Sequence, residues 1–210
     1  MTTAVVILLV AAAVSSFVDW WSVATDRLGV EFLAKPAVII CLIGVALAIE
    51  TDDNVVRGVI IAALGASLVG DVVLMTPDAR FELGLAAFLL AHVLYIVAFA
   101  PVISVGPAVA AAILVVGLGF GVVPEVMEAA SERGRLLAVA VGCYIVAVSV
   151  TAIFAVGTTV VVTGIGGAAF LASDALLGWN RFVRPAPGGR VLVHATYHVG
   201  QVGLVLWLAA

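Results

Sequence analysis

Long uncharged stretches alternate with short polar segments along the whole chain of 210 residues. The first stretch covers residues 1–18, the second covers 32–49 with only Lys35 charged, and the third covers 58–75 with only Asp71 charged. Each approaches the roughly 20 apolar residues with which a helix crosses a bilayer, where every backbone amide must bond within its own segment. The pattern therefore predicts three transmembrane helices.

The ends of these helices carry signals of their own. Residues 19–21 (Asp-Trp-Trp) follow the first stretch and suit the membrane interface. Pro36 is expected in the first turn of the second helix, a position that tolerates proline. Residues 76–78 (Thr-Pro-Asp) predict a turn after the third helix.

Two longer stretches follow, and each suffices for two helices. Residues 83–124 carry no charge and are expected to turn near 101–107, where two prolines and a glycine break the helical pattern. Residues 125–135 are predicted to form a polar loop. The uncharged residues 136–173 are too long for one span and are expected to turn near Gly157.

The last part of the chain completes the pattern. The seventh helix holds Asp174 near its end, residues 181–190 form a loop with two prolines and paired glycines, and residues 191–210 supply the eighth span. The predicted fold is an all-α integral membrane protein. It is a bundle of eight transmembrane helices that forms a single transmembrane domain over residues 1–210.

Composition excludes the other broad classes of protein. Hydrophobic residues make up 65% of the chain, and nine basic and thirteen acidic residues are its only formal charges. A soluble domain of this length would carry about 50 charged residues. Cys41 and Cys143 lie in apolar stretches and offer no disulfide framework or zinc-knuckle spacing. The scattered basic residues make no surface for nucleic acid.

The basic residues also predict an orientation. In a bundle of eight spans, the face that carries both termini has one basic residue, Arg57. The opposite face carries the other eight: Arg27, Lys35, Arg80, Arg133, Arg135, Arg181, Arg184 and Arg190. The positive-inside rule places those loops in the cytoplasm and both termini outside. The arginine-rich, Ala/Val/Gly-rich composition indicates a bacterial inner-membrane protein.

Two acids lie inside the predicted spans, where an ionisable side chain costs a few kcal/mol. Asp71 and Asp174 each lie about one turn from the cytoplasmic end of their helix, so they share a depth. Either one alone is equally well explained as an interfacial carboxylate bonded to a neighbouring helix. The matched depth favours a functional pair.

Other polar residues share helix faces at this depth. His92 and Tyr95 are spaced i, i+3, and Tyr197 and Gln201 are spaced i, i+4. Each is also compatible with a plain hydrogen bond between helices. Lys35 is compatible with a side chain that reaches back to the interface.

Two further patterns involve the histidines of the last span. His194 and His198 are spaced i, i+4, as two zinc ligands on one helix face would be, so a zinc hydrolase with His92 is a weaker alternative. Asp71 and His92 are also echoed by Asp174 and His194 at offsets of 103 and 102 residues. That echo is compatible with two parallel four-helix repeats.

The order of the motifs resembles the YhhN/TMEM86 family of multi-pass membrane proteins, which includes lysoplasmalogenases. The resemblance spans most of the chain and rests on short motifs in a fixed order. They are Lys35-Pro36, Gly70-Asp71-x-x-Leu74, Phe81-x-x-Gly84-x-x-x-Phe88-Leu89-x-Ala91-His92-x-x-Tyr95, Ser173-Asp174-x-Leu176-Leu177, Asn180-x-Phe182 and Thr196-Tyr197-x-x-x-Gln201. His194 and His198 are not part of the pattern, which weakens the zinc alternative.

The resemblance implies an ether hydrolase that cleaves the vinyl ether of lysoplasmalogen to a fatty aldehyde and a glycerophospho-head group. Its substrate is a lysophospholipid within membrane lipid, and we expect no cofactor, metal or nucleic acid. The implied catalytic residues are Asp71, Asp174 and His92, and the implied substrate-binding residues are Lys35, Tyr95, Asn180, Arg181, Tyr197 and Gln201. Vinyl ether cleavage needs an acid and an anionic partner, which two buried carboxyls can supply.

Two other functions use intramembrane acids. An intramembrane aspartyl protease resembles Gly-x-Gly-Asp around its second aspartate, whereas this chain has Ala172-Ser173-Asp174. A transporter or proton-coupled carrier needs access from both faces, yet both aspartates lie toward one side. The enzyme is therefore the preferred hypothesis, and the carrier is the alternative.

Overall fold

The computed structural model describes residues 1–76 and 81–210, and the predicted turn at 76–78 and Arg80 fall at or within the gap. No strand occurs in these two ranges, so the all-α prediction is confirmed. The helices are α1 Thr3–Ala24, α2 Leu28–Ala48, α3 Asn54–Met75, α4 Phe81–Phe99, α5 Val105–Gly119, α6 Val123–Arg133, α7 Arg135–Gly157, α8 Val161–Phe182 and α9 Gly189–Leu206, with short 3₁₀ turns at Ala100–Val102 and Trp207–Ala209.

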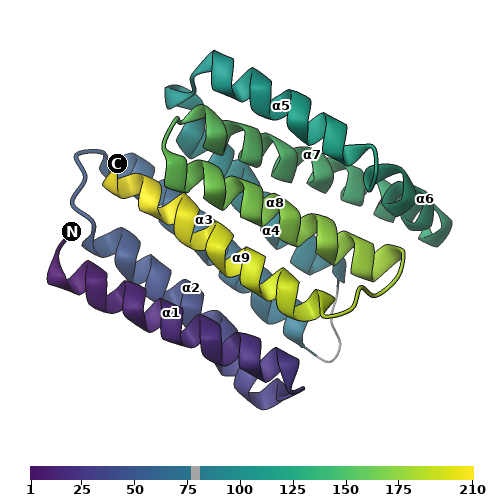
Figure 1. The fold of residues 1–210 in the computed structure, drawn as a ribbon, viewed down its shortest axis with the longest axis horizontal. Helices are drawn as coiled ribbons and strands as arrows, with labels where there is room; N and C mark the ends of the chain where they lie inside the picture. Colours follow the sequence, from purple (N-terminus) through teal and green to yellow (C-terminus); the bar gives the residue numbers. More distant parts are fainter. Residues whose placement is uncertain (77–80) are drawn as a thin grey trace.

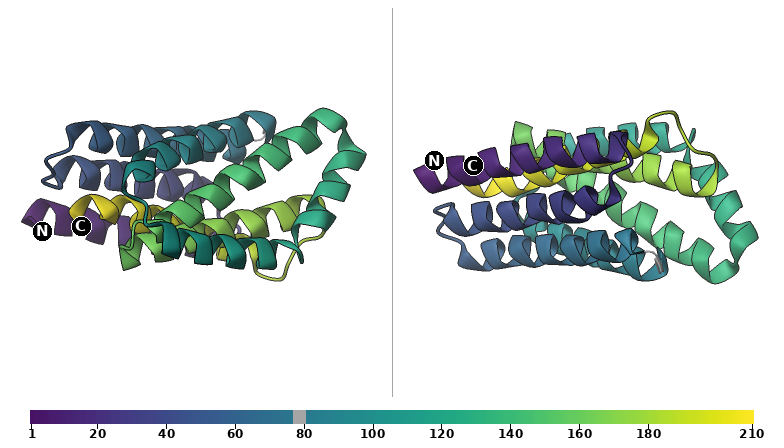
Figure 2. Two further views of the ribbon diagram at one scale, coloured as in Figure 1. Left: turned by 90° about the horizontal axis from the view of Figure 1, so that it is seen from above. Right: turned by 90° about the horizontal axis from the view of Figure 1, so that it is seen from below.

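The long helices lie side by side along one axis, and both termini lie at the same end of the bundle (Figures 1 and 2). Among the described residues, seven helices are long and apolar enough to cross a membrane. Helices α5 and α6 pass the same test only together and are bent by 60° at their junction. This is the multi-pass bundle that the hydropathy pattern predicts.

The predicted polar loop at 125–135 is wrong, because most of it is helix α6. Proline in its first turn favours the start of a helix, and Gly134, at φ 140°, ends it. Val126 and Ala130 are buried against Phe182, so one face of α6 contributes to the bundle. Helix α5, with 15 residues, is about 22 Å long and shorter than a full span.

Helices α1 and α2 also extend past their predicted ends. Helix α1 continues to Ala24, so Asp19 lies inside the helix and is fully buried. Helix α2 begins at Leu28, which places Pro36 inside the helix and not in its first turn. Lys35 is consequently two turns into α2 rather than one.

Helix α8 runs further toward the basic end of the bundle than the sequence indicates. It ends at Phe182, so Arg181 lies in its last turn rather than in a loop, and Arg190 lies in the first turn of α9. Asp174 is therefore about two turns from the end of its helix, whereas Asp71 is one turn from the end of α3. The predicted matched depth is only approximate.

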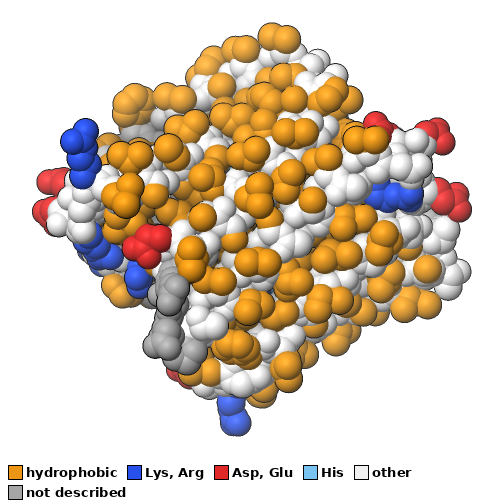
Figure 3. Space-filling view, turned by 180° about the vertical axis from the view of Figure 1, so that it is seen from behind, with side chains coloured by type: hydrophobic (Ala, Val, Ile, Leu, Met, Phe, Trp, Pro, Cys, Tyr) orange, Lys and Arg blue, Asp and Glu red, His pale blue; other side chains and the backbone are white. Residues whose placement is uncertain are grey.

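The outer surface of the bundle is apolar. Hydrophobic side chains cover the middle of the face in Figure 3, and most charged side chains lie at its two ends. Strongly exposed residues include Leu136, Leu33 and Ile113, which are 84%, 76% and 71% exposed. A surface of this kind is stable only in lipid, so the chain is a multi-pass membrane protein.

Three glycines bring α8 and α9 into close contact. A Cβ at Gly203 would lie 2.6 Å from the Cα of Gly166 and 2.6 Å from the carbonyl oxygen of Val162. A Cβ at Gly200 would meet Phe170 at 2.9 Å. Small residues at such contacts let membrane helices pack backbone to backbone. The contact fixes the spacing between Asp174 on α8 and Tyr197 on α9.

Candidate functional site

Asp71 is the centre of one buried polar group. Its Oδ1 lies 2.9 Å from the Nζ of Lys35 on α2, and its Oδ2 accepts a hydrogen bond of 2.7 Å from the hydroxyl of Tyr197 on α9. Gln201 donates to that hydroxyl at 3.3 Å and accepts from the Tyr95 hydroxyl at 2.6 Å. Five of the predicted site residues are therefore connected in one network.

Asp174 is the centre of a second group. Its Oδ2 lies 3.2 Å from the Nε2 of His92 on α4 and accepts a hydrogen bond of 2.8 Å from the hydroxyl of Tyr144 on α7. The Nδ1 of His92 lies 3.2 Å from the hydroxyl oxygen of Thr151. His92 is fully buried.

Thr151 and Asp174 contact the two ring nitrogens of His92. The Thr151 hydroxyl donates to the carbonyl of Ala147 at 3.0 Å, an arrangement in which its oxygen can accept from an Nδ1–H of His92. Contact between Nε2 and a carboxylate oxygen then requires a proton between them. That proton lies either on Nε2 or on the carboxyl of Asp174. In both arrangements it lies within the Asp174–His92 pair.

The two groups meet at Phe170. The centroid of its ring lies 4.7 Å from that of His92 and 5.4 Å from that of Tyr197, both edge to face. Each aspartate bonds a residue of the other helix pair, since Asp71 on α3 bonds α9 and Asp174 on α8 bonds α4. The site therefore exists only when the α3–α4 and α8–α9 pairs are packed together.

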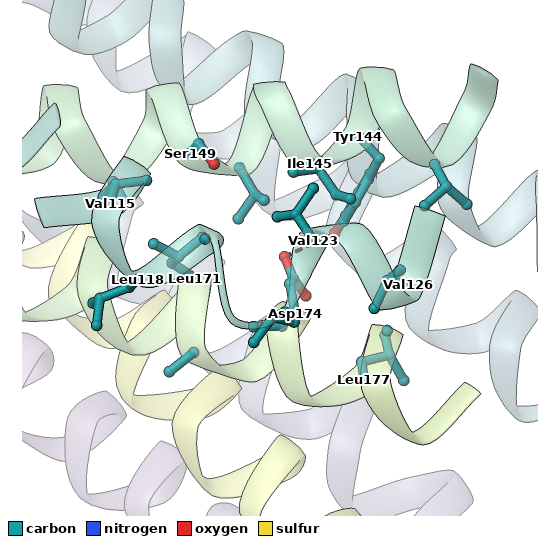
Figure 4. A pocket seen from close by; sticks show the side chains of 18 of the residues that line it. Val115, Leu118, Val123, Val126, Tyr144, Ile145, Ser149, Leu171, Asp174 and Leu177 are labelled. Atoms are coloured by element: carbon teal, nitrogen blue, oxygen red, sulfur yellow. Dashed lines mark hydrogen bonds between the residues drawn. The ribbon is translucent and has the colours of Figure 1, made fainter. Parts of the chain in front are cut away.

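A cavity of about 320 Å³ adjoins the second group. It lies between α4, α5, α6, α7 and α8, and its lining is almost entirely aliphatic and aromatic. Its polar lining residues are Tyr144, Ser149 and Asp174, and Figure 4 shows Tyr144 and Asp174 pointing toward each other from α7 and α8. Asp71 is not among the residues that line it. The cavity can take an apolar chain next to an acid.

Two of the predicted substrate-binding residues have other partners. The side-chain oxygen of Asn180 accepts a hydrogen bond of 2.8 Å from the backbone of Ala186, so it holds the α8–α9 connection. The guanidinium of Arg181 is exposed and lies 5.0 Å from the ring centroid of Phe81, which lines the cavity. Arg181 is therefore near the cavity, and Asn180 is engaged in shaping the loop.

His194 and His198 belong to a third group, separate from His92. The Nδ1 of His194 lies 2.7 Å from Asp19, and its Nε2 lies 3.8 Å from Glu31. Trp20 donates to the Nδ1 of His198 at 3.1 Å, which leaves the hydrogen of a neutral imidazole on Nε2. Within residues 1–76 and 81–210, no three or more potential ligands are placed to hold a metal ion.

Sequence reasoning missed Tyr144 and Thr151. Both lie in the uncharged residues 136–173, for which the sequence predicted only a turn near Gly157. One signal was present, because the chain contains only three tyrosines and all three hydroxyls bond in these two groups. Asp19 and Glu31 were missed as buried residues because the ends of α1 and α2 were misplaced.

Comparison with known proteins gives one consistent result. Human lysoplasmalogenase TMEM86B is 29% identical over 174 residues, which cover 83% of this chain and 73% of the human protein. The lysoplasmalogenase TMEM86B of Sus scrofa is 33% identical over 147 residues, 67% of this chain and 58% of the pig protein. The protein of that name from Rattus norvegicus is 29% identical over 177 residues, 84% and 72% of the two chains. No solved structure matches.

The family comparison covers most of the chain. The YhhN family model matches residues 30–208, which extend from the start of α2 to the end of α9 and contain both aspartate groups. Helix α1, with Asp19, precedes the matched region. The chain belongs to the YhhN family.

Proposed function

We propose that this protein is a membrane-embedded hydrolase that cleaves the vinyl ether bond of lysoplasmalogen. The observation that carries the proposal is the hydrogen-bonded pair of His92 and Asp174 beside an aliphatic cavity. Vinyl ethers are cleaved after a proton is added to carbon, and the substrate has one long hydrocarbon chain. Its lysoplasmalogenase relatives support the same activity.

The chemistry follows from that proton. Asp174, which lines the cavity, donates it to the alkenyl carbon that is β to the ether oxygen, and the bond electrons of the double bond form the new C–H bond. The positive charge falls on the oxocarbenium unit. Water attacks its carbon, the proton lost by this water returns to the Asp174–His92 pair, and the hemiacetal collapses. The products are a fatty aldehyde and a glycerophospho-alcohol.

The Asp71 group supplies the anionic partner in this proposal. Asp71 is fully buried, and the ammonium of Lys35 lies 2.9 Å away, where it compensates the charge of a carboxylate. Tyr197, Gln201 and Tyr95 hold that carboxylate in a fixed direction. A fixed negative charge stabilises a developing oxocarbenium ion without reorganisation, and Asp71, which does not line the cavity, acts on it through space. Asp174 is thus the acid, and Asp71 the anion.

The proposed orientation places the substrate in the cytoplasmic leaflet. Arg133, Arg181 and Arg190 lie at the helix ends opposite the termini, so the positive-inside rule puts this end in the cytoplasm of a bacterial inner membrane. Both termini are then extracytoplasmic. Arg181, exposed beside the cavity, is our candidate partner for the lipid phosphate.

The test is an assay of purified protein with matched 1-alkenyl and 1-acyl lysophospholipids, in which fatty aldehyde and fatty acid are measured separately. We expect aldehyde from the alkenyl lipid and no fatty acid from the acyl lipid. In D₂O the aldehyde should carry one deuterium on the carbon next to the carbonyl, because the proton from the enzyme is added there. Release of fatty acid alone, or no release from either lipid, would overturn the proposal.

A further inference from the structure

The cavity beside Asp174 is long and has two different ends. Its lining on α7 extends from Val141 to Val156 along one face of the helix. Asp174 reaches it at the level of Tyr144, to which it is bonded. The distance along α7 from Tyr144 to Val156 is twelve residues, or about 18 Å. Most of the cavity thus lies on one side of the acid.

Two arginines lie at the end of the cavity that is nearest the carboxy-terminal ends of α6 and α8. The guanidinium of Arg133 lies 4.9 Å from the ring centroid of Phe182, and that of Arg181 lies 5.0 Å from the ring centroid of Phe81. Both rings line the cavity. Two positive charges therefore flank this end, which suits an anionic phosphate.

The opposite end is lined by small side chains from three helices. They are Ala111 on α5, Ala152 on α7 and Ala168 on α8, with Val156 beyond them. An alanine methyl leaves the room that a larger side chain would occupy. Larger side chains at these three positions would therefore shorten the cavity.

We propose that these three alanines set the longest hydrocarbon chain that the site accepts. A single-chain phospholipid lies lengthwise in the cavity, with its phosphate at Arg133 and Arg181, its first chain carbons at Asp174 and its methyl end at Ala111, Ala152 and Ala168. This inference rests on the proposed function, whose acid fixes where the chain begins.

The length of the cavity sets the number of chain carbons that the site can hold. An extended chain advances about 1.2 Å per bond, since the three bonds of an extended residue span about 3.5 Å. The roughly 18 Å beyond Tyr144 on α7 then hold about fifteen carbons. A phenyl ring at position 111 fills the space to the next lining turn of α5, where Leu114 lies, and shortens the limit by about four carbons.

The experiment measures binding of lipids that the site cannot cleave. Saturated 1-O-alkyl lysophosphoethanolamines with 10, 14 and 18 carbons are titrated into protein in nanodiscs. The variants are Ala111→Phe and Ala168→Phe, and the control is Ala110→Phe, at an exposed neighbour on α5 that does not line the cavity. Two lining variants on different helices keep the test valid if one fails to fold.

We expect each lining variant to weaken binding of the 14-carbon lipid at least tenfold and to leave the 10-carbon lipid within twofold, whereas the 18-carbon lipid exceeds the limit of the native protein as well. The control should bind all three lipids as the native protein does. Equal loss for all chain lengths, or no change in a folded lining variant, would overturn the inference. Because the lipids are not hydrolysed, this result is independent of aldehyde release, which tests the proposed function by itself.

Discussion

The buried ion pair between Lys35 and Asp71 predicts an asymmetric response to mutation. The two charges are 2.9 Å apart, with side chains 11% and 0% exposed. At an effective dielectric constant of about 20, their attraction is about 6 kcal/mol, which offsets the cost of taking both charges out of water. Removing one partner leaves the other charge without that compensation.

Lys35→Met should therefore lower the free energy of unfolding by about 3–5 kcal/mol, because it leaves a fully buried carboxylate unpaired. Asp71→Asn should cost less, since the partly exposed lysine can extend toward the interface. The double variant Lys35→Met/Asp71→Asn removes both charges and should lose less than about 2 kcal/mol.

The measurement is an unfolding titration in mixed micelles, followed by the fluorescence of the four tryptophans. Ile39→Met, one turn further along α2 and fully buried, controls for methionine in this helix and should cost less than about 1.5 kcal/mol. The ion-pair account would be refuted if the double variant lost the sum of the two single losses in free energy of unfolding. It would also be refuted if Lys35→Met left the free energy of unfolding unchanged.

Three other predictions test the packing, the orientation and the chemistry. Gly203→Val should prevent close packing against Gly166 and abolish both folding and activity, whereas Gly65→Val, which has no neighbour within 4 Å of its Cβ, should retain both in a thermal-stability assay. Reporters fused after Ser131 should read cytoplasmic and those fused at Ala210 external, and a cytoplasmic carboxy terminus would overturn the orientation. Strong chelators should leave hydrolysis intact, since the proton chemistry is assigned to side chains, and activity restored by zinc would contradict this.

The fold was predictable because lipid imposes a simple rule on the sequence. Every uncharged stretch of adequate length became a helix, and the breaks near 101–107 and Gly157 are real. The errors lie where polar residues were taken to end helices. Asp19 and Glu31 are inside α1 and α2 because His194 and Arg190 compensate their charges, and such partners are 159 or more residues away.

The site was predictable in its residue types more than in its pairings. Asp71, Asp174 and His92 stand out because ionisable groups in lipid are costly. Their pairings could not be predicted, since Asp71 bonds Tyr197 across 126 residues, and Tyr144, which bonds Asp174, was not predicted at all. Only the packing of α3–α4 against α8–α9 reveals that each aspartate has its own network.

The paired acids are tested most directly by aldehyde release from alkenyl lysophospholipid by three asparagine variants. Asp174→Asn and Asp71→Asn keep the size and hydrogen bonding of the side chain but remove its proton or charge, so each should reduce turnover by about 100-fold or more in a folded, monodisperse protein. The double variant should be little worse than either single. Asp19→Asn makes the same change at a third buried acid, in the His194 group, and should retain activity. Near-normal turnover by folded Asp174→Asn or Asp71→Asn protein would contradict the account.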